Sequence, residues 1–253
     1  MRNLNRCIQN WGSDGYLEEH NPFQAPAAAL LEEIRSACER AGRDAHRVEV
    51  IGVTKTVDKN AITPLLEAGI CHFGENRWQQ AKDKVTLPNT DSAVWHFIGR
   101  LQSNKVKYIV RHFQWIHSLT SVPLAKEVSK RAEQIGVTMQ CMLQVNVSGE
   151  ETKDGIASDE IVPILQEIRE LPGVRIRGLM TMAPFYEDPL LTRPTFAALR
   201  EALTDTRERL SWPDLTELSM GMSHDFQVAV EEGATMVRIG RRLMNEWTEL
   251  KQE

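Results

Sequence analysis

The chain has 253 residues, of which 42% are hydrophobic and 26% are charged, a composition typical of one large globular domain. A net charge of -5 and an isoelectric point near 5.9 exclude a generally basic surface, so the sequence predicts no nucleic-acid partner. No apolar run reaches the roughly 18 to 20 residues that span a bilayer, and no charged-then-apolar leader begins the chain. We therefore expect a cytoplasmic protein without a membrane partner.

The cysteines and histidines show no spacing typical of a metal or redox site. Cys7, Cys38, Cys71 and Cys141 form no Cys-x-x-Cys pair, and the seven histidines form no His-x-x-x-His or His-Glu-x-x-His motif. Cys141 lies in an apolar run, which favours a small core residue over a nucleophile. The sequence therefore predicts no bound metal.

The predicted elements begin after an N-terminal extension, residues 1–24, which has no clear hydrophobic period and no assigned role. Apolar residues then recur at helical spacing over 27–41, and Gly42 ends that predicted helix. Short apolar runs alternate with helical segments from Val48 onward. The predicted strands cover residues 48–54, 70–74, 94–98, 115–118, 139–147, 175–180, 217–220 and 236–239. The predicted helices between them cover residues 59–67, 77–84, 105–111, 122–134, 159–169, 195–209 and 225–232.

Eight strands joined by helices predict an α/β fold, a (β/α)8 TIM barrel formed by a single domain over residues 25–253. An open doubly wound sheet usually has only five or six strands. Functional residues of a TIM barrel follow the carboxyl ends of its strands. The residues in those positions are Lys55, Gly74, Glu75, Asn76, His96, Gly99, Arg100, Leu101, Gln102, His117, Asn146, Met180, Thr181, Met182, Gly221, Met222, Ser223, Arg238 and Gly240.

Lys55 ends the first predicted strand, in the stretch Val-Glu-Val-Ile-Gly-Val-Thr-Lys-Thr at 48–56. We expect apolar residues to surround half of its side chain, because the strand reads as buried on both faces. Such desolvation lowers the pKa of an ammonium and frees the amine to attack an aldehyde. The alternative is a lysine that merely ends a strand and extends into solvent.

The second informative stretch is Leu-Ser-Met-Gly-Met-Ser-His-Asp-Phe at 218–226. Ser223 is predicted to N-cap the helix that follows, which leaves backbone N–H groups available for an anion. Gly240, after the last strand, lets the backbone approach a ligand closely, so the loops after strands seven and eight predict a phosphate site. The alternative is a serine cap and a glycine turn that bind nothing.

A phosphate site beside a reactive amine predicts pyridoxal 5′-phosphate (PLP) as the cofactor, bound through an imine to Lys55. Arg238 is expected near the pyridine nitrogen, where it cannot accept a proton, so the ring stays neutral and is a weak electron sink. The alternative for Arg238 is an ion pair with an acidic neighbour. We interpret His96 and His117 as hydrogen-bonded strand-end residues in preference to catalytic bases.

Eight short motifs are spread along the chain from Ala41 to Gly240, and together they are highly specific. They are Ala-Gly-Arg at 41–43, Gly-Val-Thr-Lys-Thr at 52–56, Phe-Gly-Glu-Asn at 73–76, Trp-His-Phe-Ile-Gly-Arg-Leu-Gln-Ser-Asn-Lys at 95–105, Gln-Val-Asn-Val-Ser-Gly-Glu at 144–150, Arg-Gly-Leu-Met-Thr-Met-Ala-Pro at 177–184, Leu-Ser-Met-Gly-Met-Ser at 218–223 and Val-Arg-Ile-Gly at 237–240. In this order they resemble the pyridoxal phosphate homeostasis proteins, single-domain barrels related to the N-terminal domain of alanine racemase.

The resemblance implies that Lys55 carries the imine, that Arg238 contacts the pyridine nitrogen, that Ser223 and Gly240 hold the phosphate, and that Asn76 lines the pocket. The full predicted set of cofactor-binding residues is Lys55, Asn76, Met222, Ser223, Arg238, Gly240 and Arg241. Family members are thought to buffer and deliver PLP, which implies little or no turnover and transient contact with PLP-dependent apoenzymes. A barrel of this size is stable alone, and no heptad or long exposed apolar helix favours an obligate partner, so we expect a monomer.

Two enzyme classes remain as alternatives. A PLP-dependent amino-acid racemase needs a second proton donor, which alanine racemase takes from a tyrosine of a second domain. The tyrosines here are Tyr16, Tyr108 and Tyr186, and the chain ends soon after Gly240, so we expect no such domain. A cofactor-free aldolase that uses Lys55 directly leaves the predicted phosphate site less well explained.

The sequence departs from the family pattern at two places. The family usually has a small hydroxyl residue after Val-Arg-Ile-Gly, whereas Arg241 follows here. Arg241 either adds positive charge to the phosphate site or crowds it, which predicts a change of affinity without its sign. The usual acidic pair after Met-Ser is replaced by His224 and Asp225.

Overall fold

Eight parallel strands close into a barrel in their order along the chain, with the last strand hydrogen-bonded to the first. The computed structural model describes residues 21–150 and 154–250. Its strands are β1 (Glu49–Val53), β2 (His72–Glu75), β3 (Val94–Phe97), β4 (Trp115–Leu119), β5 (Met139–Gln144), β6 (Val174–Met180), β7 (Glu217–Met222) and β8 (Met236–Ile239). The predicted (β/α)8 barrel is thereby confirmed.

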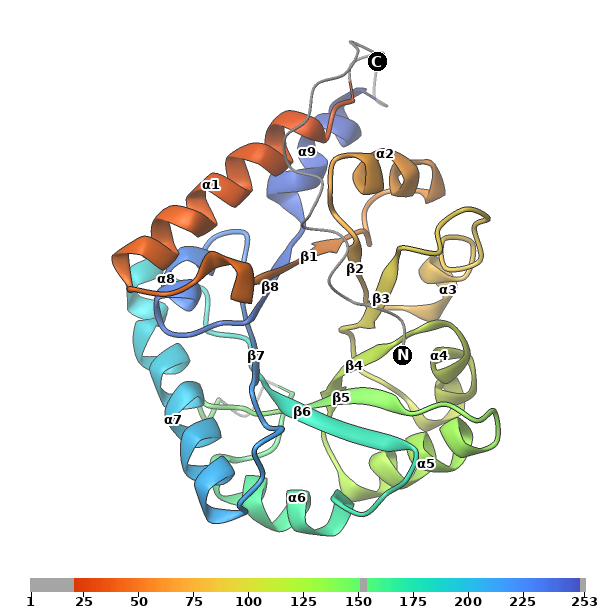
Figure 1. Ribbon diagram of the computed structural model, residues 1–253, viewed down its shortest axis with the longest axis vertical. Helices are drawn as coiled ribbons and strands as arrows, with labels where there is room; N and C mark the ends of the chain where they lie inside the picture. The colour runs from red at the N-terminus through yellow and green to blue at the C-terminus, as the bar shows by residue number, and fades with distance from the viewer. Residues whose placement is uncertain (1–20, 151–153, 251–253) are drawn as a thin grey trace.

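Helices surround the strands, which occupy the centre of the view in Figure 1. They are α1 (Gln24–Arg40), α2 (Ile62–Glu67), α3 (Trp78–Ala81), α4 (Val106–His112), α5 (Val122–Glu133), α6 (Ile161–Ile168), α7 (Arg193–Arg209), α8 (Phe226–Glu231) and α9 (Arg241–Leu250). Short 3-10 turns add η2 (Ala45–Arg47), η3 (Lys59–Ala61), η4 (Ser103–Lys105), η5 (Ser158–Glu160) and η6 (Pro189–Thr192). No helix in these described ranges is both long and apolar enough to cross a bilayer.

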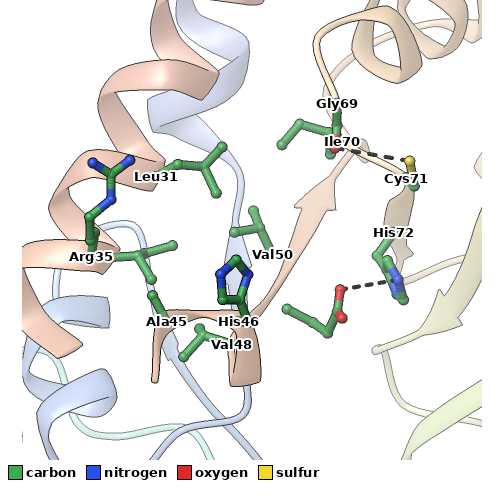
Figure 2. A pocket seen from close by; sticks show the side chains of 12 residues that line it. Leu31, Arg35, Ala45, His46, Val48, Val50, Gly69, Ile70, Cys71 and His72 are labelled. Atoms are coloured by element: carbon green, nitrogen blue, oxygen red, sulfur yellow. Dashed lines mark hydrogen bonds and ion pairs between the residues drawn. The ribbon is translucent and has the colours of Figure 1, made fainter. Parts of the chain in front are cut away.

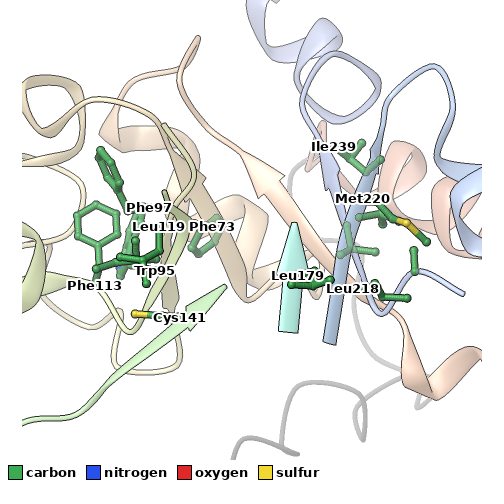
Figure 3. Packing of buried hydrophobic residues seen from close by; sticks show 14 of the residues in the cluster. Phe73, Trp95, Phe97, Phe113, Leu119, Cys141, Leu179, Leu218, Met220 and Ile239 are labelled. Atoms are coloured by element: carbon green, nitrogen blue, oxygen red, sulfur yellow. The ribbon is translucent and has the colours of Figure 1, made fainter. Parts of the chain in front are cut away.

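The strands are buried on both faces because each face packs on a different apolar group. Outward-facing side chains pack beneath the helices, as Figure 3 shows for Phe73, Trp95 and Leu218. A separate apolar cluster comes from five strands and occupies part of the barrel interior with Ile51, Trp115, Met142, Met180 and Met236. Continuous apolar runs in the sequence, such as that of β1, therefore correspond to strands covered on both sides.

Three elements differ most from the sequence prediction. The run 139–147 ends as a strand at Gln144, because Val145 pairs with Ile156 in an isolated bridge and the chain turns away. The helix predicted at 77–84 is only one turn, Trp78–Ala81. The helix α9 was not predicted, and it forms because Leu243 and Met244 are buried on one of its faces.

The N-terminal extension predicted over residues 1–24 lies mostly outside the described residues, so the division at residue 24 stays a prediction. The helix α1 begins at Gln24, three residues before the predicted start. Phe23 is fully buried and stacks on Trp247 of α9 with ring centroids 5.3 Å apart. The segment just before α1 is therefore part of the packed barrel wall.

Candidate functional site

A cavity of about 400 Å³ opens at the carboxyl ends of the strands. All seven residues predicted to bind the cofactor line it: Lys55, Asn76, Met222, Ser223, Arg238, Gly240 and Arg241. The remaining lining residues are Val53, Ile98, Gly99, Arg100, Gln144, Asp154, Met182, Ala183, Pro184, Phe185, Thr192, His224 and Asp225. Closure of the barrel brings β1 beside β8, so Lys55 and Gly240 face the same space.

Arg238 lies at the floor of this cavity and is fixed on both sides. Its Nη1 donates to Ser219 Oγ at 2.7 Å, and its Nη2 donates to the Thr181 carbonyl oxygen at 2.8 Å. Burial lowers the pKa of Arg238 to about 10, while the nearby Asp225 carboxylate raises it. The guanidinium therefore remains charged at neutral pH and presents donors but no acceptor to a ligand.

Ser223 does not N-cap the following helix, contrary to the prediction. The helix α8 begins only at Phe226, and Ser223 Oγ instead accepts a hydrogen bond from the Gly240 backbone N–H at 3.2 Å. This contact ties the loop after β7 to the loop after β8. The expected helix terminus is supplied by α9, whose first turn is closed by hydrogen bonds from the Leu243 and Met244 N–H groups to the Gly240 carbonyl.

The first turn of α9 begins at Arg241 beside the cavity and carries the positive end of a ten-residue helix. A Cβ added to Gly240 would lie 3.6 Å from the Cβ of Val53, an ordinary contact. The protein itself therefore tolerates a side chain at Gly240, and only a ligand would make glycine necessary there. Arg241 is exposed and lines the same cavity.

Lys55 is exposed at the cavity mouth, so the expectation that apolar residues surround half of it is wrong. The physical reason is that β1 ends at Val53 and Thr54 is the last buried residue of this stretch, which leaves Lys55 in the turn that follows. The strand end is nevertheless firmly held. Thr54 Oγ1 donates to Glu75 Oε1 at 2.6 Å, and Lys84 Nζ donates to the Thr54 carbonyl at 2.6 Å.

Asn76 contributes a polar atom that no neighbour satisfies. Its Oδ1 is buried and accepts no hydrogen bond from any described residue. Gly99 makes room for this strand end, since a Cβ there would lie 2.2 Å from the Asn76 carbonyl oxygen. An unpaired buried amide oxygen is costly, and a ligand hydroxyl in the cavity would relieve that cost.

Sequence reasoning placed Thr181 at a strand end but did not identify Ser219, Thr181 and Asp225 as the residues that support Arg238. Asp225 is buried and accepts the Met222 backbone N–H at 2.6 Å. Burial raises the pKa of this carboxyl, while the Met222 N–H and the Arg238 charge lower it. The sequence signal was present, because the motif Leu-Ser-Met-Gly-Met-Ser contains Ser219, but only the pairing of β7 with β8 brings it to Arg238.

The histidines predicted to be structural are not in the cavity. His96 and His117 are fully buried in the barrel beneath it, each hydrogen-bonded to other side chains, which supports their interpretation as structural residues. Among the described residues, no group of three or more His, Cys, Asp or Glu side chains is arranged to hold a metal ion.

The family model for the alanine racemase N-terminal domain matches residues 27–244. Alanine racemase of Clostridium difficile is 13% identical with a TM-score of 0.69, over 87% of this chain and 56% of that one, a likeness of fold alone. The barrel is thus of the alanine racemase N-terminal-domain class.

Two relatives are more similar. A pyridoxal phosphate homeostasis protein of Aquifex aeolicus is 45% identical over 86% of this chain and 95% of its own length. The structure of PipY from Synechococcus elongatus PCC7942 with PLP bound is 36% identical with a TM-score of 0.74, over 85% of this chain and 99% of that one. Within the alanine racemase class, the chain belongs to the pyridoxal phosphate homeostasis protein family.

Proposed function

We propose that this chain binds PLP in the cavity at the carboxyl ends of its strands, holds it as an imine on Lys55, and acts in intracellular PLP homeostasis without turnover of its own. One observation carries the proposal: a single cavity contains an accessible lysine, a buried arginine and a helix N-terminus. A relative whose structure holds PLP supports the same ligand. The family assignment favours this function over a cofactor-free aldolase.

The residues present fit the groups of this cofactor. The first turn of α9, with Ser223 and Arg241, is suited to a phosphate because its backbone N–H groups and positive charge meet there. Arg238 would donate to the ring nitrogen, the unpaired Oδ1 of Asn76 would accept from the ring hydroxyl, and Met222 would contact the ring. When bound, PLP would supply an aldehyde, and the Lys55 amine would hold it as an imine with the loss of water.

The same residues argue against efficient racemisation. Arg238 cannot accept a proton from the ring nitrogen, so the electron-accepting capacity of the ring would stay low. Racemisation also needs proton donors on both faces of the ring. Of the tyrosines in the described ranges, Tyr108 stacks on Trp78, and neither Tyr108 nor Tyr186 lines the cavity.

The test is borohydride reduction of the PLP-loaded protein followed by intact mass measurement and peptide mapping. We expect one pyridoxyl-phosphate adduct, on Lys55. Absence of an adduct, or adducts spread over surface lysines, would contradict the proposal. An enantiomer-resolved assay of alanine and serine is the second arm, and sustained turnover above that of free PLP would favour the racemase.

Delivery of the cofactor requires contact with an apoenzyme, and the cavity mouth has a suitable surface. The exposed apolar side chains Met182, Phe185 and Met222 line it, and Tyr186, Leu190 and Leu191 are exposed apolar residues of the same connection between β6 and α7. His224 Nε2 contacts the Tyr186 carbonyl oxygen at 3.0 Å and so ties this loop to the loop after β7. We propose that this apolar rim contacts the PLP-dependent apoenzyme.

Phe185→Ser tests the rim, because Phe185 is 76% exposed and its loss should leave the fold intact. We expect slower PLP transfer to an apoenzyme with unchanged PLP affinity, and Val137→Ser, at an exposed apolar residue outside the cavity lining, is the matched control. Equal transfer rates for both variants would contradict the role of the rim. The monomeric state and the cytoplasmic location remain predictions for light scattering and cell fractionation.

A further inference from the structure

A row of histidines crosses the barrel interior beneath the cavity. His72 on β2, His96 on β3 and His117 on β4 come from three neighbouring strands. The His72 Nδ1 and His96 Nε2 atoms are 2.9 Å apart, and the His96 Nδ1 and His117 Nε2 atoms are also 2.9 Å apart. Trp115 stacks on His96 with ring centroids 5.6 Å apart, so the row lies in apolar surroundings.

Each end of the row meets a charged group. At the upper end, His117 Nδ1 is 2.8 Å from Ser219 Oγ, the atom that accepts the Arg238 guanidinium. At the lower end, His72 Nε2 is 3.2 Å from the carboxylate of Glu49 on β1. The contacts thus form one continuous hydrogen-bond chain from Arg238 at the cofactor cavity to the opposite end of the barrel.

The two ends dictate the direction of every hydrogen bond between them. Arg238 can only donate and an ionised Glu49 can only accept. Ser219 Oγ therefore accepts from Arg238 and gives its own proton to His117 Nδ1. Each neutral imidazole must then accept at Nδ1 and donate from Nε2, until His72 donates to Glu49. One proton arrangement satisfies all the atoms of the chain, and it requires three neutral histidines.

The electrostatics agree with this arrangement. Burial lowers the pKa of His96 well below its ordinary value, and a proton on His117 or His72 would lower it further. Burial also lowers the pKa of His117 strongly, with a contribution from Arg238. For His72 the lowering by burial is opposed by Glu49. Because Glu49 favours the charged form, His72 is the member through which a proton can enter.

We propose that His72, His96, His117 and Ser219 form a polarised chain that positions Arg238 for the cofactor, so that protonation of His72 weakens the hold on PLP. These are positioning residues, and the proposal rests on the proposed function because it takes Arg238 to face the bound ring. The established role of the family does not include this row of hydrogen bonds in the barrel interior.

The weakening follows from the geometry of the chain. A charged His72 donates from both nitrogens, so His96 must accept at Nε2 and donate from Nδ1 to His117. His117 then donates from Nδ1 to Ser219 Oγ, which already accepts from Arg238. Two donors converge on one hydroxyl, and the hydroxyl proton loses its acceptor, which is costly in a buried place. The hydrogen bond from Arg238 to Ser219 Oγ is therefore the contact that is weakened.

The lower end opens on a second cavity, of about 220 Å³, at the amino-terminal ends of β1 and β2 (Figure 2). The charged or titratable groups around His72 are Glu49 on β1, His96 on β3, and Arg35 and His46, which line this cavity with it. The dashed line to His72 in Figure 2 is its contact with Glu49. Of these, Glu49 and His96 contact the imidazole directly.

The first experiment uses the PLP-free protein and so does not depend on the proposed function. Nitrogen-15 NMR of the histidine side chains at pH 7.5 should find His72, His96 and His117 neutral, each protonated at Nε2. A charged imidazole, or a proton on Nδ1 of any of the three, would overturn the polarised chain.

The second experiment measures PLP affinity from pH 7.5 to pH 5 for the wild type and for His72→Gln. A glutamine amide can donate to Glu49 and accept from His96, so it preserves the chain but cannot be protonated. We expect equal affinities at pH 7.5 and an additional loss of about tenfold at pH 5 in the wild type only, the effect of one buried hydroxyl without an acceptor. His46→Gln, at an exposed residue of the same cavity, should behave as the wild type.

The outcomes separate the two proposals. No PLP adduct on Lys55 at pH 7.5 would contradict the proposed function, whereas binding with the same pH profile in wild type and His72→Gln would contradict the chain. Linkage supplies a further sign: if protonation of His72 weakens PLP binding, PLP must lower the pKa of His72 measured by NMR. The field of an anionic phosphate alone would raise that pKa, so a rise on binding would also overturn the proposal.

Discussion

The two walls of the cofactor cavity are built differently. On the side of β7 and β8, Arg238 is held by Ser219 and Thr181, Ser223 is bonded to Gly240, and the polar groups are fixed before any ligand arrives. On the side of β1, Lys55 extends from a turn and is exposed. We call the first the rigid wall, because hydrogen bonds fix its polar groups, and the second the exposed wall, because it ends in the exposed amine of Lys55.

This difference suits a protein that stores a cofactor and gives it up. A preformed anion and ring site provides affinity without reorganisation. The covalent bond is formed by the one exposed group, where water and an acceptor amine can reach it. Were Lys55 as deeply enclosed as Arg238, release would require opening of the barrel. The following predictions test each wall, from the largest expected effect to the smallest.

Lys55→Ala removes the exposed wall's only covalent contribution. We expect complete loss of the reducible adduct and a fall in PLP affinity of at least about 100-fold. The noncovalent binding by the rigid wall should remain. Absorbance of the bound cofactor and equilibrium dialysis measure both effects. Lys59→Ala, at an exposed lysine of η3 outside the cavity, is the control and should keep the adduct. Retention of the adduct in Lys55→Ala would refute the assignment.

Arg238→Met breaks the rigid wall from within. It leaves Ser219 Oγ and the Thr181 carbonyl without their charged donor, which should cost about 3 kcal/mol of unfolding free energy as well as PLP affinity. Urea denaturation of the PLP-free protein gives the stability. Arg242→Met removes an exposed pair with Glu33 and should cost less than about 1 kcal/mol. Similar losses for the two variants would mean that the wall is not preformed.

Acid should destabilise the interior that supports the rigid wall. Burial lowers the pKa values of His96 and His117 in the folded state. Below pH 6.5 these imidazoles therefore bind protons in the unfolded chain but not in the folded one. The free energy of unfolding therefore decreases as the pH falls from 6.5 toward the pKa values of the folded state, by about 1.4 kcal/mol per pH unit for each imidazole.

Urea denaturation between pH 7.5 and pH 5 measures this slope. His96→Gln should make it shallower by the share of one imidazole, whereas His46→Gln, at an exposed position, should leave it unchanged. Carboxylates contribute to the slope in all three proteins, so the comparison among them isolates the buried ring. An identical slope for wild type and His96→Gln would show that His96 takes up its proton while folded.

Gly240→Ala adds a methyl group to the rigid wall without disturbing the fold. Its Cβ would meet only Val53 at ordinary contact distance, so we expect unchanged thermal stability. If the phosphate approaches the backbone here, PLP affinity should fall about tenfold, roughly 1.4 kcal/mol. Isothermal titration and thermal denaturation on the same preparation separate the two effects. Unchanged affinity would place the phosphate elsewhere in the cavity.

Arg241→Gln should have the smallest effect, because the side chain is exposed and screened by salt. We expect a two- to fivefold loss of PLP affinity at low ionic strength that disappears at high salt. A gain in affinity would show that Arg241 crowds the phosphate instead of attracting it. Titrations at two salt concentrations decide between these outcomes.

The sequence by itself determined the barrel and which residues form its site. Eight apolar runs separated by helical segments specify the repeated βα unit, and residues at strand ends must meet at one end of a closed barrel. Lys55, Asn76, Ser223, Arg238 and Gly240 could therefore be gathered into one cavity without coordinates, because each lies next to a strand end that local patterning identifies.

Only the tertiary structure decided how those residues are held. Ser223 bonds to Gly240 instead of capping a helix, Lys55 is exposed, and α9 supplies the helix terminus. The hydrogen-bond chain from Glu49 to Arg238 depends on the register between strands that are far apart in the sequence. Hydropathy patterns report whether a residue is buried, but a buried polar side chain acquires its partner only through strand pairing, which no local pattern encodes.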